Sequence, residues 1–551
     1  MNPSRPSKLS RCFEMGGTLE ILDKRWRAAC EVLFKEEVGP LEDYAQWLSG
    51  LTRQNVIRKS SISGKEVAYA INEYAEGSRW ISFDEIDYGA KYAPLSLDQI
   101  KDLDSLLDAV SERACYAGNI ILGNSGQVEK SSNITDSYFM LNTSMLGDCK
   151  NLAYSSRGRL CTDCFGVYGP GESEFCIRCP QTYRDKRCFE MWVTQNCSDG
   201  YYSYNLRNCS ECMFCFNVQN KRFAIGNLEL GKDKYIQLKE KLIADMVGEL
   251  KRKKKLPSLM DIVAKSGFEK PAISAPETRQ DGGEGKKATE AAFQKTSSLL
   301  FGAKLRGIDS YSSWLTRNGE SMLRAKSAAS GRKILFFKSA LSPVHLPILT
   351  RAVTEREALE LGKTARVSLE DAEGLALANA HRVIGSLAFF NMEFEEGTNT
   401  CLTECSTTIE SSLSYRSGAM VYSKYCGYIF YPRSCEHMFG GNQLFDCSFC
   451  IKCYHSVKLT RCFECDSCRT CSDSYFCHNC EGLQDSMFCF NAKNLRYAIG
   501  NAEVGREKYL EIKGKLLAGI AGRLEKGHDL NLSIYNIGAV GRKPTKAGKA
   551  R

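Results

Sequence analysis

The chain has 551 residues and a net charge of +9, with 43% hydrophobic and 25% charged residues. This composition is typical of a folded protein with several domains and excludes a largely disordered chain. No stretch approaches the roughly 18 apolar residues of a membrane span, and the first residues lack the apolar core of a secretory signal. We therefore expect a cytoplasmic protein without membrane contact, or one inside a virion if it is viral.

Cysteine is the unusual component of the composition. The chain has 27 cysteines, and an odd number cannot pair completely within one chain. In a reducing compartment such residues remain thiols or become metal ligands.

A long internal repeat divides the chain into two halves. Residues 213–231 recur as residues 487–505, both beginning Met-Phe-Cys-Phe-Asn, and the same offset relates other motifs of the two halves without a gap. Farther upstream, Tyr44-Ala-Gln-Trp-Leu48 corresponds to Tyr311-Ser-Ser-Trp-Leu315. We infer a tandem duplication in which each half has a leading domain and a cysteine-rich domain.

The first half begins with a helical or mixed leading domain, residues 1–120. Residues 18–35 and 97–113 have helical periodicity, and Ser96-Leu-Asp-Gln99 is typical of a capping box. The cysteine-rich domain follows over residues 121–231. A capping helix is predicted over 232–255, where Tyr235, Leu238 and Leu242 share one face.

A linker is predicted over residues 256–292, with a short helix around residues 256–264. The second half repeats the order of the first. It has a helical or mixed leading domain (293–395), a cysteine-rich domain (396–505), a capping helix (506–527) and a basic flexible tail (528–551). In its leading domain, Thr354-Glu-Arg-Glu357 is a second capping-box pattern.

The cysteine-rich domains contain a shorter period. Cysteines recur at every eighteenth position and form a structural ladder in each half: Cys161, Cys179, Cys197, Cys215 and Cys435, Cys453, Cys471, Cys489. Columns of like residues at a fixed period are typical of a β-solenoid, in which each coil places equivalent residues above one another. We therefore predict an α+β protein whose halves each contain a short cysteine-lined β-solenoid of about 18 residues per coil, closed by a helical cap.

The step of three between many cysteines predicts thiols that face inward around each coil. A thiol is small and apolar, which suits a narrow interior. The repeated Phe-Asn-x-x-Asn-x-Arg segments, at residues 216–227 and 490–501, end the cysteine columns and are predicted to close each solenoid.

Zinc is the cofactor that the pattern favours, ahead of an iron–sulfur cluster at the run from Cys462 to Cys471, which has only two residues before its last cysteine where the bacterial ferredoxin run has three. A C-x2-C-x14-C-x2-C pattern close to the spacing of tetrathiolate sites is formed by Cys447, Cys450, Cys465 and Cys468, with Cys453 and Cys471 as alternative ligands. The corresponding positions of the first half are Ser173, Cys176, Met191 and Thr194, so the first half cannot build this tetrad. The alternative is a core of reduced thiols without metal.

The pattern indicates a structural role rather than catalysis. No phosphate-binding loop, dinucleotide fingerprint or nucleophile–base arrangement can be inferred, so we expect no enzyme and no catalytic residues. Stiff stacked coils in a duplicated chain favour a scaffold that assembles with copies of itself or within a larger particle. The alternative is a zinc-stabilised nucleic-acid-binding protein that uses the tail and the basic run Lys251, Arg252, Lys253, Lys254 and Lys255.

The cysteine ladders, ended by Phe-Cys-Phe-Asn-x-x-Asn-x-Arg-aromatic and followed by a Tyr-containing helix, resemble a group of uncharacterised cysteine-rich repeat proteins from uncultivated prokaryotes and their viruses. The resemblance covers the two cysteine-rich domains and implies no established activity. In those proteins another cysteine commonly stands where this chain has Ala224 and Ala498, so the resemblance does not extend metal binding to the cap.

Overall fold

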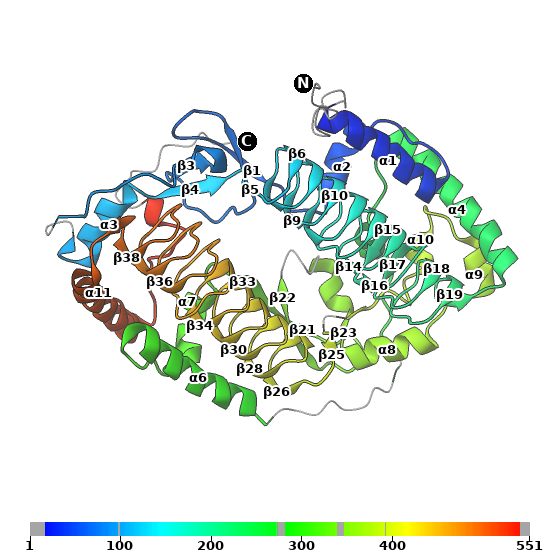
Figure 1. Ribbon diagram of the computed structural model, residues 1–551. Helices are drawn as coiled ribbons and strands as arrows, with labels where there is room; N and C mark the ends of the chain where they lie inside the picture. Colours follow the sequence, from blue (N-terminus) through cyan, green and yellow to red (C-terminus); the bar gives the residue numbers. More distant parts are fainter. Residues whose placement is uncertain are drawn as a thin grey trace, which may run out of the picture.

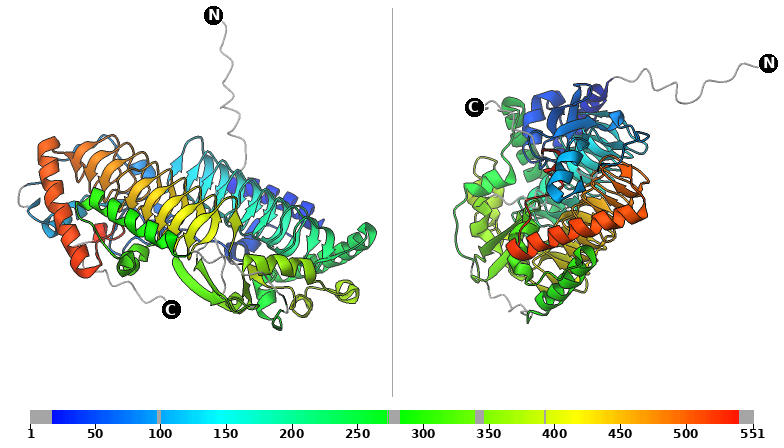
Figure 2. Two further views of the ribbon diagram at one scale, coloured as in Figure 1. Left: turned by 90° about the horizontal axis from the view of Figure 1, so that it is seen from below. Right: turned by 90° about the vertical axis from the view of Figure 1, so that its left-hand side faces the viewer.

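Two stacks of short strands lie side by side, with helices along their outer sides (Figure 1). This computed structural model describes residues 17–96, 100–271, 273, 282–338, 346–391 and 393–539. The views in Figure 2 show that the stacks together form an elongated body flanked by helices. The predicted mixture of helices and sheets is confirmed.

Stack A is the set of strands between residues 121 and 229. Its strands are β5 (Ile121–Leu122), β6 (Gly126–Glu129), β7 (Ser132–Thr135), β8 (Tyr138–Leu141), β9 (Ser144–Gly147), β10 (Lys150–Ala153), β11 (Ser156–Arg159), β12 (Thr162–Phe165), β13 (Glu174–Ile177), β14 (Thr182–Tyr183), β15 (Lys186–Trp192), β16 (Thr194–Gln195), β17 (Tyr201–Tyr204), β18 (Ser210–Met213), β19 (Arg222–Ile225) and β20 (Leu228–Glu229).

Stack B is the corresponding set between residues 395 and 503. Its strands are β25 (Glu395–Glu396), β26 (Thr400–Thr403), β27 (Ser406–Ile409), β28 (Ser412–Tyr415), β29 (Gly418–Val421), β30 (Lys424–Gly427), β31 (Phe430–Arg433), β32 (Glu436–Phe439), β33 (Asn442–Phe445), β34 (Ser448–Ile451), β35 (Tyr454–Val457), β36 (Ser472–Tyr475), β37 (Gln484–Met487), β38 (Arg496–Ile499) and β39 (Ala502–Glu503).

One turn of the chain in a stack takes twelve positions. Lys150 pairs in parallel with Tyr138 on one side and with Thr162 on the other, twelve positions away in each direction. The intervening strand β11 pairs with β9 in a second sheet, so successive strands alternate between two sheets. The longer coil that the cysteine ladders predicted is therefore wrong.

The error arises because the ladder spacing of eighteen corresponds to one and a half turns. Every third residue points inward, so a step of twelve and a step of eighteen both lead from one inward position to another. Only the step of twelve leads to the adjacent strand of the same sheet, as from Cys176 to Cys188. Successive ladder cysteines such as Cys161 and Cys179 consequently lie in different columns.

A left-handed backbone conformation at every third residue makes these tight turns. Asn133, Asp136 and Phe139 have φ angles of 59°, 47° and 60°, and the pattern continues through both stacks. The conformation costs a residue with a Cβ atom about 1–2 kcal/mol, so the hydrogen bonds between turns must offset it. Each left-handed residue bends the chain between short extended segments, which allows two strands in each turn.

The interior of each turn is lined by small side chains that bond to the backbone. Cys179 Sγ lies 3.3 Å from the carbonyl oxygens of both Ile177 and Cys188. Ser137 Oγ donates to Thr135 O at 2.8 Å and accepts from Cys149 N in the next turn at 2.9 Å. Thiols and hydroxyls thus link neighbouring turns while filling a narrow core, and the predicted burial of the ladder cysteines is confirmed.

Each stack ends in an antiparallel hairpin and a helix. In stack A, β19 turns through Gly226 and Asn227 into β20, and helix α4 (Lys232–Lys253) follows. In stack B, β38 pairs in the same way with β39, and helix α11 (Arg506–Gly527) follows. Tyr235 of α4 packs on Phe223 with ring centroids 5.6 Å apart, so the predicted apolar face of this helix does cover the last turn.

The leading segment of each half divides between the two stacks. In the first half, helix α1 (Thr18–Phe34), the 3-10 turn η2 (Leu41–Tyr44) and α2 (Ala45–Ser49) pack against stack A. Four of the elements after them pack against stack B: β2 (Glu66–Tyr69), β3 (Arg79–Ser82), α3 (Leu103–Ser111) and β4 (Cys115–Gly118). Strand β1 (Val56–Lys59) pairs with β2, and η3 (Phe83–Glu85) packs with Ile81 and Leu122. The first residues of this predicted domain and Leu97–Gln99 of the first capping box lie outside the described residues.

The second half shows the same division in reverse. Helix α6 (Glu284–Phe301), η5 (Ile308–Tyr311) and α7 (Ser312–Thr316) pack against stack B. The next elements lie mainly against stack A: β21 (Ser321–Lys326), β22 (Lys333–Lys338), η6 (Leu346–Arg351), β23 (Ala352–Val353), α8 (Glu355–Thr364), α9 (Leu369–Gly374), α10 (Ala380–Val383) and β24 (Phe390–Asn391). The predicted capping box of Thr354 and Glu357 is confirmed at the start of α8.

Equivalent hydrogen bonds hold these exchanged segments in place. Asn217 Nδ2 in stack A donates to Phe389 O at 2.9 Å, and Asn491 Nδ2 in stack B donates to Cys115 O at 2.8 Å. The two donors, and likewise the two acceptors, are related by the same offset as residues 213 and 487, so each half repeats the other's contact. The leading segment of each half therefore packs on the stack of the other half. The sequence suggested separate leading domains, but neither segment forms a compact body of its own.

The predicted linker contains more regular structure than expected. Helix α5 (Leu259–Ala264) confirms the predicted short helix, but α6 already begins at Glu284, before the boundary predicted at residue 293. Residues 272 and 274–281 of the linker, and residues 540–551 of the basic tail, lie outside the described residues. In the described part of the tail, η7 (Ile537–Ala539) packs on the β3–β4 region through Tyr116.

Candidate functional site

The predicted zinc ligands are all buried inside stack B, but in the wrong register for a tetrad. Cys447 and Cys450 lie in one turn and Cys465 and Cys468 in the next. Because strands stack at a step of twelve, the neighbour of Cys450 in the next turn is Cys462 rather than Cys468. The two predicted pairs are eighteen residues apart, which is one and a half turns, so they lie on opposite sides of the interior of the stack.

The alternative ligands do not restore the site. Cys453 stacks on Cys465, whereas Cys471 follows Leu459 in its column. Among the residues that the structure describes, no group of three or more His, Cys, Asp or Glu side chains is arranged to hold a metal ion. No disulfide joins the described cysteines, so the geometry favours thiols as packing groups.

The ladder cysteines of the two stacks share their burial but not the direction of their pKa shifts. All eight are buried: Cys161, Cys179, Cys197, Cys215, Cys435, Cys453, Cys471 and Cys489. Burial raises the pKa of the Cys179 thiol to about 11, whereas a hydrogen bond with Cys447 lowers the pKa of Cys435. A thiol whose pKa is raised in this way is protonated at neutral pH and a poor nucleophile.

Alkylation should separate these buried thiols from the half-exposed ones. Among the cysteines that the structure describes, we expect iodoacetamide to modify mainly Cys115, Cys401 and Cys405 in the folded protein, because these three are half-exposed. All 27 cysteines should react in denaturant. Peptide mapping by mass spectrometry measures both, and rapid native modification of Cys179 or Cys450 would contradict a packed thiol core.

A buried ion pair at one corner of each stack was missed by the sequence analysis. In stack A, Arg178 Nε donates to Glu190 Oε1 at 2.6 Å, and both side chains are at most 5% exposed. Arg178 also donates to Trp47 O, and Glu190 Oε2 accepts from Leu259 N at 3.0 Å. The pair thus ties α2 and α5 to the stack.

Stack B repeats this arrangement with lysine in place of arginine. Lys452 Nζ lies 3.3 Å from Glu464 Oε1 and donates to Trp314 O at 2.9 Å. Glu464 Oε2 accepts from Ile534 N at 3.0 Å. A signal was present in the sequence, because Phe175-Cys-Ile-Arg-Cys179 and Phe449-Cys-Ile-Lys-Cys453 keep a cation at the same non-inward position.

A histidine–aspartate pair lies where the exchanged β3–β4 segment meets stack B. His478 Nδ1 is 3.0 Å from Asp466 Oδ2, which also accepts from Tyr74 Oη at 2.7 Å. His478 Nε2 accepts from Ala117 N at 3.2 Å. Both ring nitrogens are therefore engaged in buried structural bonds, which leaves neither available as a general base.

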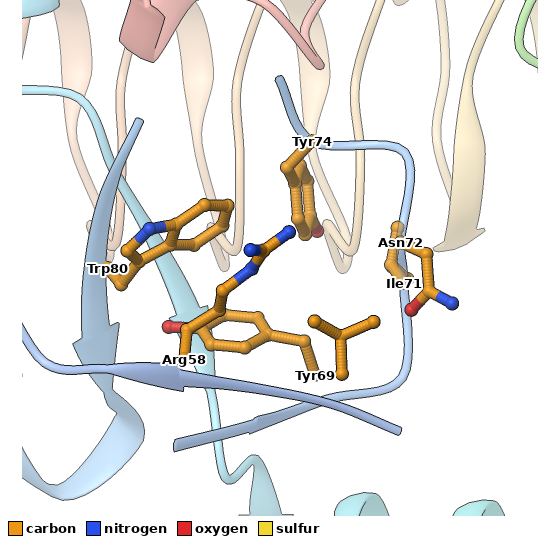
Figure 3. A pocket seen from close by; sticks show the side chains of 7 residues that line it. Arg58, Tyr69, Ile71, Asn72, Tyr74 and Trp80 are labelled. Atoms are coloured by element: carbon orange, nitrogen blue, oxygen red, sulfur yellow. The ribbon is translucent and has the colours of Figure 1, made fainter. Parts of the chain in front are cut away.

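The surface depressions next to this segment are not built like ligand pockets. Figure 3 shows Arg58 reaching among the rings of Tyr69, Tyr74 and Trp80. These ring centroids are 5.1–6.5 Å apart, so the rings contact one another and leave no space for a guest between them. A second depression of about 460 Å³, lined by residues such as Lys65, Asn119 and Lys130, is open to solvent.

The basic run at the end of α4 is largely neutralised by neighbouring acids. Ion pairs join Lys251 to Glu36 at 2.5 Å and Lys254 to Asp43 at 3.1 Å, and Arg252 and Lys253 both pair with Glu249. Lys255 is exposed. These side chains stabilise the helix end and its contact with α1 and η2.

None of the helices in the described ranges is long and apolar enough to cross a bilayer. Comparisons of the chain with the models of known protein families, with curated proteins and with solved structures gave no match.

Proposed function

We propose that this protein is a non-enzymatic scaffold that assembles with copies of itself or within a larger particle, which could be viral. In this proposal each stack is a short β-solenoid and the two halves descend from a tandem duplication. The reciprocal exchange of leading segments carries the proposal, because it converts two stacks into one body that cannot bend without breaking buried contacts.

Ion pairs along the outer faces support the same role. Glu172 pairs with Arg184, Lys424 with Glu436, and Arg461 with Asp473, at 2.8, 2.9 and 2.7 Å. The members of each pair are twelve positions apart in sequence, so each bond joins adjacent turns. A single exposed pair contributes little to stability, but a series along the axis resists separation of the turns.

The nucleic-acid alternative receives less support from the geometry. A phosphate-binding run needs free cations, whereas four of the five residues in the predicted run are paired with carboxylates. The alternative therefore depends on the tail, whose basic residues lie outside the described ranges.

Sedimentation and electron microscopy over a range of protein concentrations test the proposal. We expect discrete assemblies larger than one chain that form without nucleic acid and change little between low and high salt. A variant truncated after residue 539 is the control and should assemble equally well. A monomer at every concentration would contradict self-assembly, and nucleic-acid binding that falls steeply with salt and with the truncation would favour the alternative.

A further inference from the structure

A cluster of polar side chains, some buried and some partly exposed, lies between the two stacks. We call it the interstack chamber and define it by Arg53, Glu73, Arg157, Tyr168, Glu320, Asn442 and His455. Arg157 projects from β11 of stack A, and Asn442 and His455 belong to β33 and β35 of stack B. Arg53 and Glu320 occupy equivalent positions of the two halves, related by the offset that also relates Tyr44 to Tyr311.

The guanidinium of Arg157 is the unusual group in this chamber. Its side chain is only 5% exposed, and neither Nη1 nor Nη2 forms a hydrogen bond with any residue that the structure describes. The nearest carboxylate oxygen, Glu320 Oε1, is 4.0 Å from Nη1. A buried cation without hydrogen bonds is strongly unfavourable, so the site needs acceptors that the surrounding protein groups do not supply.

Two neighbouring side chains also have a buried polar atom without a hydrogen-bond partner among the described residues. The Tyr168 hydroxyl is buried and has no hydrogen-bond partner in the described part of the chain, and it lies within electrostatic range of Arg157 and Arg53. Asn442 Nδ2 is 3.5 Å from Glu320 Oε1, while its Oδ1 is buried without a partner among the described residues. If the positions of Nδ2 and Oδ1 of Asn442 are exchanged, the Nδ2 group becomes a further hydrogen-bond donor in the chamber.

The charges around the chamber do not exclude an anion. Arg53 and Glu73 pair with each other at 2.5 Å. Burial raises the pKa of Glu320, and the charges of Arg157 and Arg53 oppose this shift. Burial also lowers the pKa of His455 to about 4, so the imidazole is neutral, and its Nδ1 lies 2.9 Å from Gln443 Oε1.

We propose that the interstack chamber binds a small oxyanion, with Arg157 and Tyr168 as its main donors. The two unpartnered guanidinium nitrogens of Arg157 match an acceptor with several oxygens better than a single water, which can accept only two hydrogen bonds. The side chains of Arg53 and Glu73 are 24% and 36% exposed, so this side of the cluster is the one that solvent reaches. The bound anion would connect the two halves, a role beyond the proposed scaffold and independent of it.

Thermal unfolding and calorimetric titration of the full chain test this site. The probes are inorganic phosphate, sulfate, formate and chloride at matched ionic strength. We expect saturable one-to-one binding of at least one oxyanion, and a melting temperature raised by roughly 1–2 °C at about 10 to 100 times the Kd, with no such effect of chloride. Preference for formate over phosphate and sulfate would assign a carboxylate ligand, and the reverse preference an inorganic oxyanion.

Variants locate the binding. Arg157→Gln should weaken it by at least about tenfold, and the conservative Tyr168→Phe should weaken it by several-fold while keeping the fold. Arg159→Gln is the matched control, because Arg159 lies on the same strand but is 74% exposed and pairs with Asp148, so binding should be unchanged. The absence of saturable oxyanion binding, or binding that survives both Arg157→Gln and Tyr168→Phe, would overturn the proposal.

Discussion

Replacing Lys452 with methionine is expected to lower the free energy of unfolding by about 3–5 kcal/mol, because the substitution leaves Glu464 charged and buried without its partner. Both side chains of this pair are completely buried. Burial raises the pKa of Glu464 and lowers that of Lys452, and in each case the charge of the partner opposes the shift. Urea or guanidinium unfolding followed by circular dichroism measures the change.

Two further variants separate a buried charge from a general loss of packing. The double variant Lys452→Met/Glu464→Gln removes both charges and should recover most of the lost stability. Arg461→Met breaks the exposed pair with Asp473 and should change stability by no more than about 1 kcal/mol. A loss below about 1 kcal/mol for Lys452→Met would show that the buried pair does not hold the α7 corner to stack B.

Replacing Asp185 with asparagine is expected to stabilise the protein increasingly as the pH rises from about 4 to about 7. Asp185 is an inward residue of stack A, completely buried, and it accepts from Cys197 N at 2.8 Å. Burial raises its pKa to about 7, whereas an unfolded aspartate titrates near 3.9. Between these values only the folded state holds the proton, so the wild-type protein loses about 1.4 kcal/mol of stability per pH unit, and about 4 kcal/mol in all.

Asparagine at position 185 has nearly the same shape as aspartate and can keep its hydrogen bonds, but it has no ionisable group. Its oxygen can accept from Cys197 N, and its amide can donate to Thr194, which already contacts the carboxyl group. Chemical unfolding of both proteins at pH 4, 5.5 and 7.5 should therefore show a difference that grows with pH. A constant difference across this range would mean that Asp185 titrates normally.

Asp199→Asn is the matched control with the opposite sign. Burial disfavours the charged form of Asp199, but two hydrogen bonds from Arg187, both at 2.7 Å, outweigh this and lower its pKa. A lowered pKa contributes stability above the unfolded value, and this contribution is lost as the pH falls through the folded value. The asparagine variant should thus be the less stable protein at neutral pH and approach the wild type in acid.

The local patterns were read correctly where short-range chemistry decides the structure. Thr354 and Glu357 form their capping box because a hydroxyl and a carboxyl three positions apart satisfy each other's backbone groups. Tyr235, Leu238 and Leu242 cover the last turn because helical spacing places them on one face. The inward step of three was visible because it is a property of neighbouring residues along the chain.

The stacking period was misread because any multiple of three preserves the inward face. A step of eighteen joins Cys161 to Cys179 and Cys447 to Cys465, and all four are buried as expected. The hydrogen-bonded neighbour, however, is set by how many residues close one turn, and the left-handed residue at every third position closes it after twelve. The zinc tetrad was predicted from the longer period, which places its two cysteine pairs directly above each other. With twelve residues per turn the two pairs are not neighbours in adjacent turns.

The sequence by itself determined the repeat of two halves, the inward residues, and the helices that end each stack, because these depend on spacing along the chain. Only the tertiary structure decided that the halves exchange their leading segments and that Lys452 meets Glu464 beneath Trp314. Only the tertiary structure brought Arg157 of stack A close to Glu320 of the second half. Such contacts join residues far apart in sequence, and their free energy depends on burial and on the charge of a partner that no local pattern specifies.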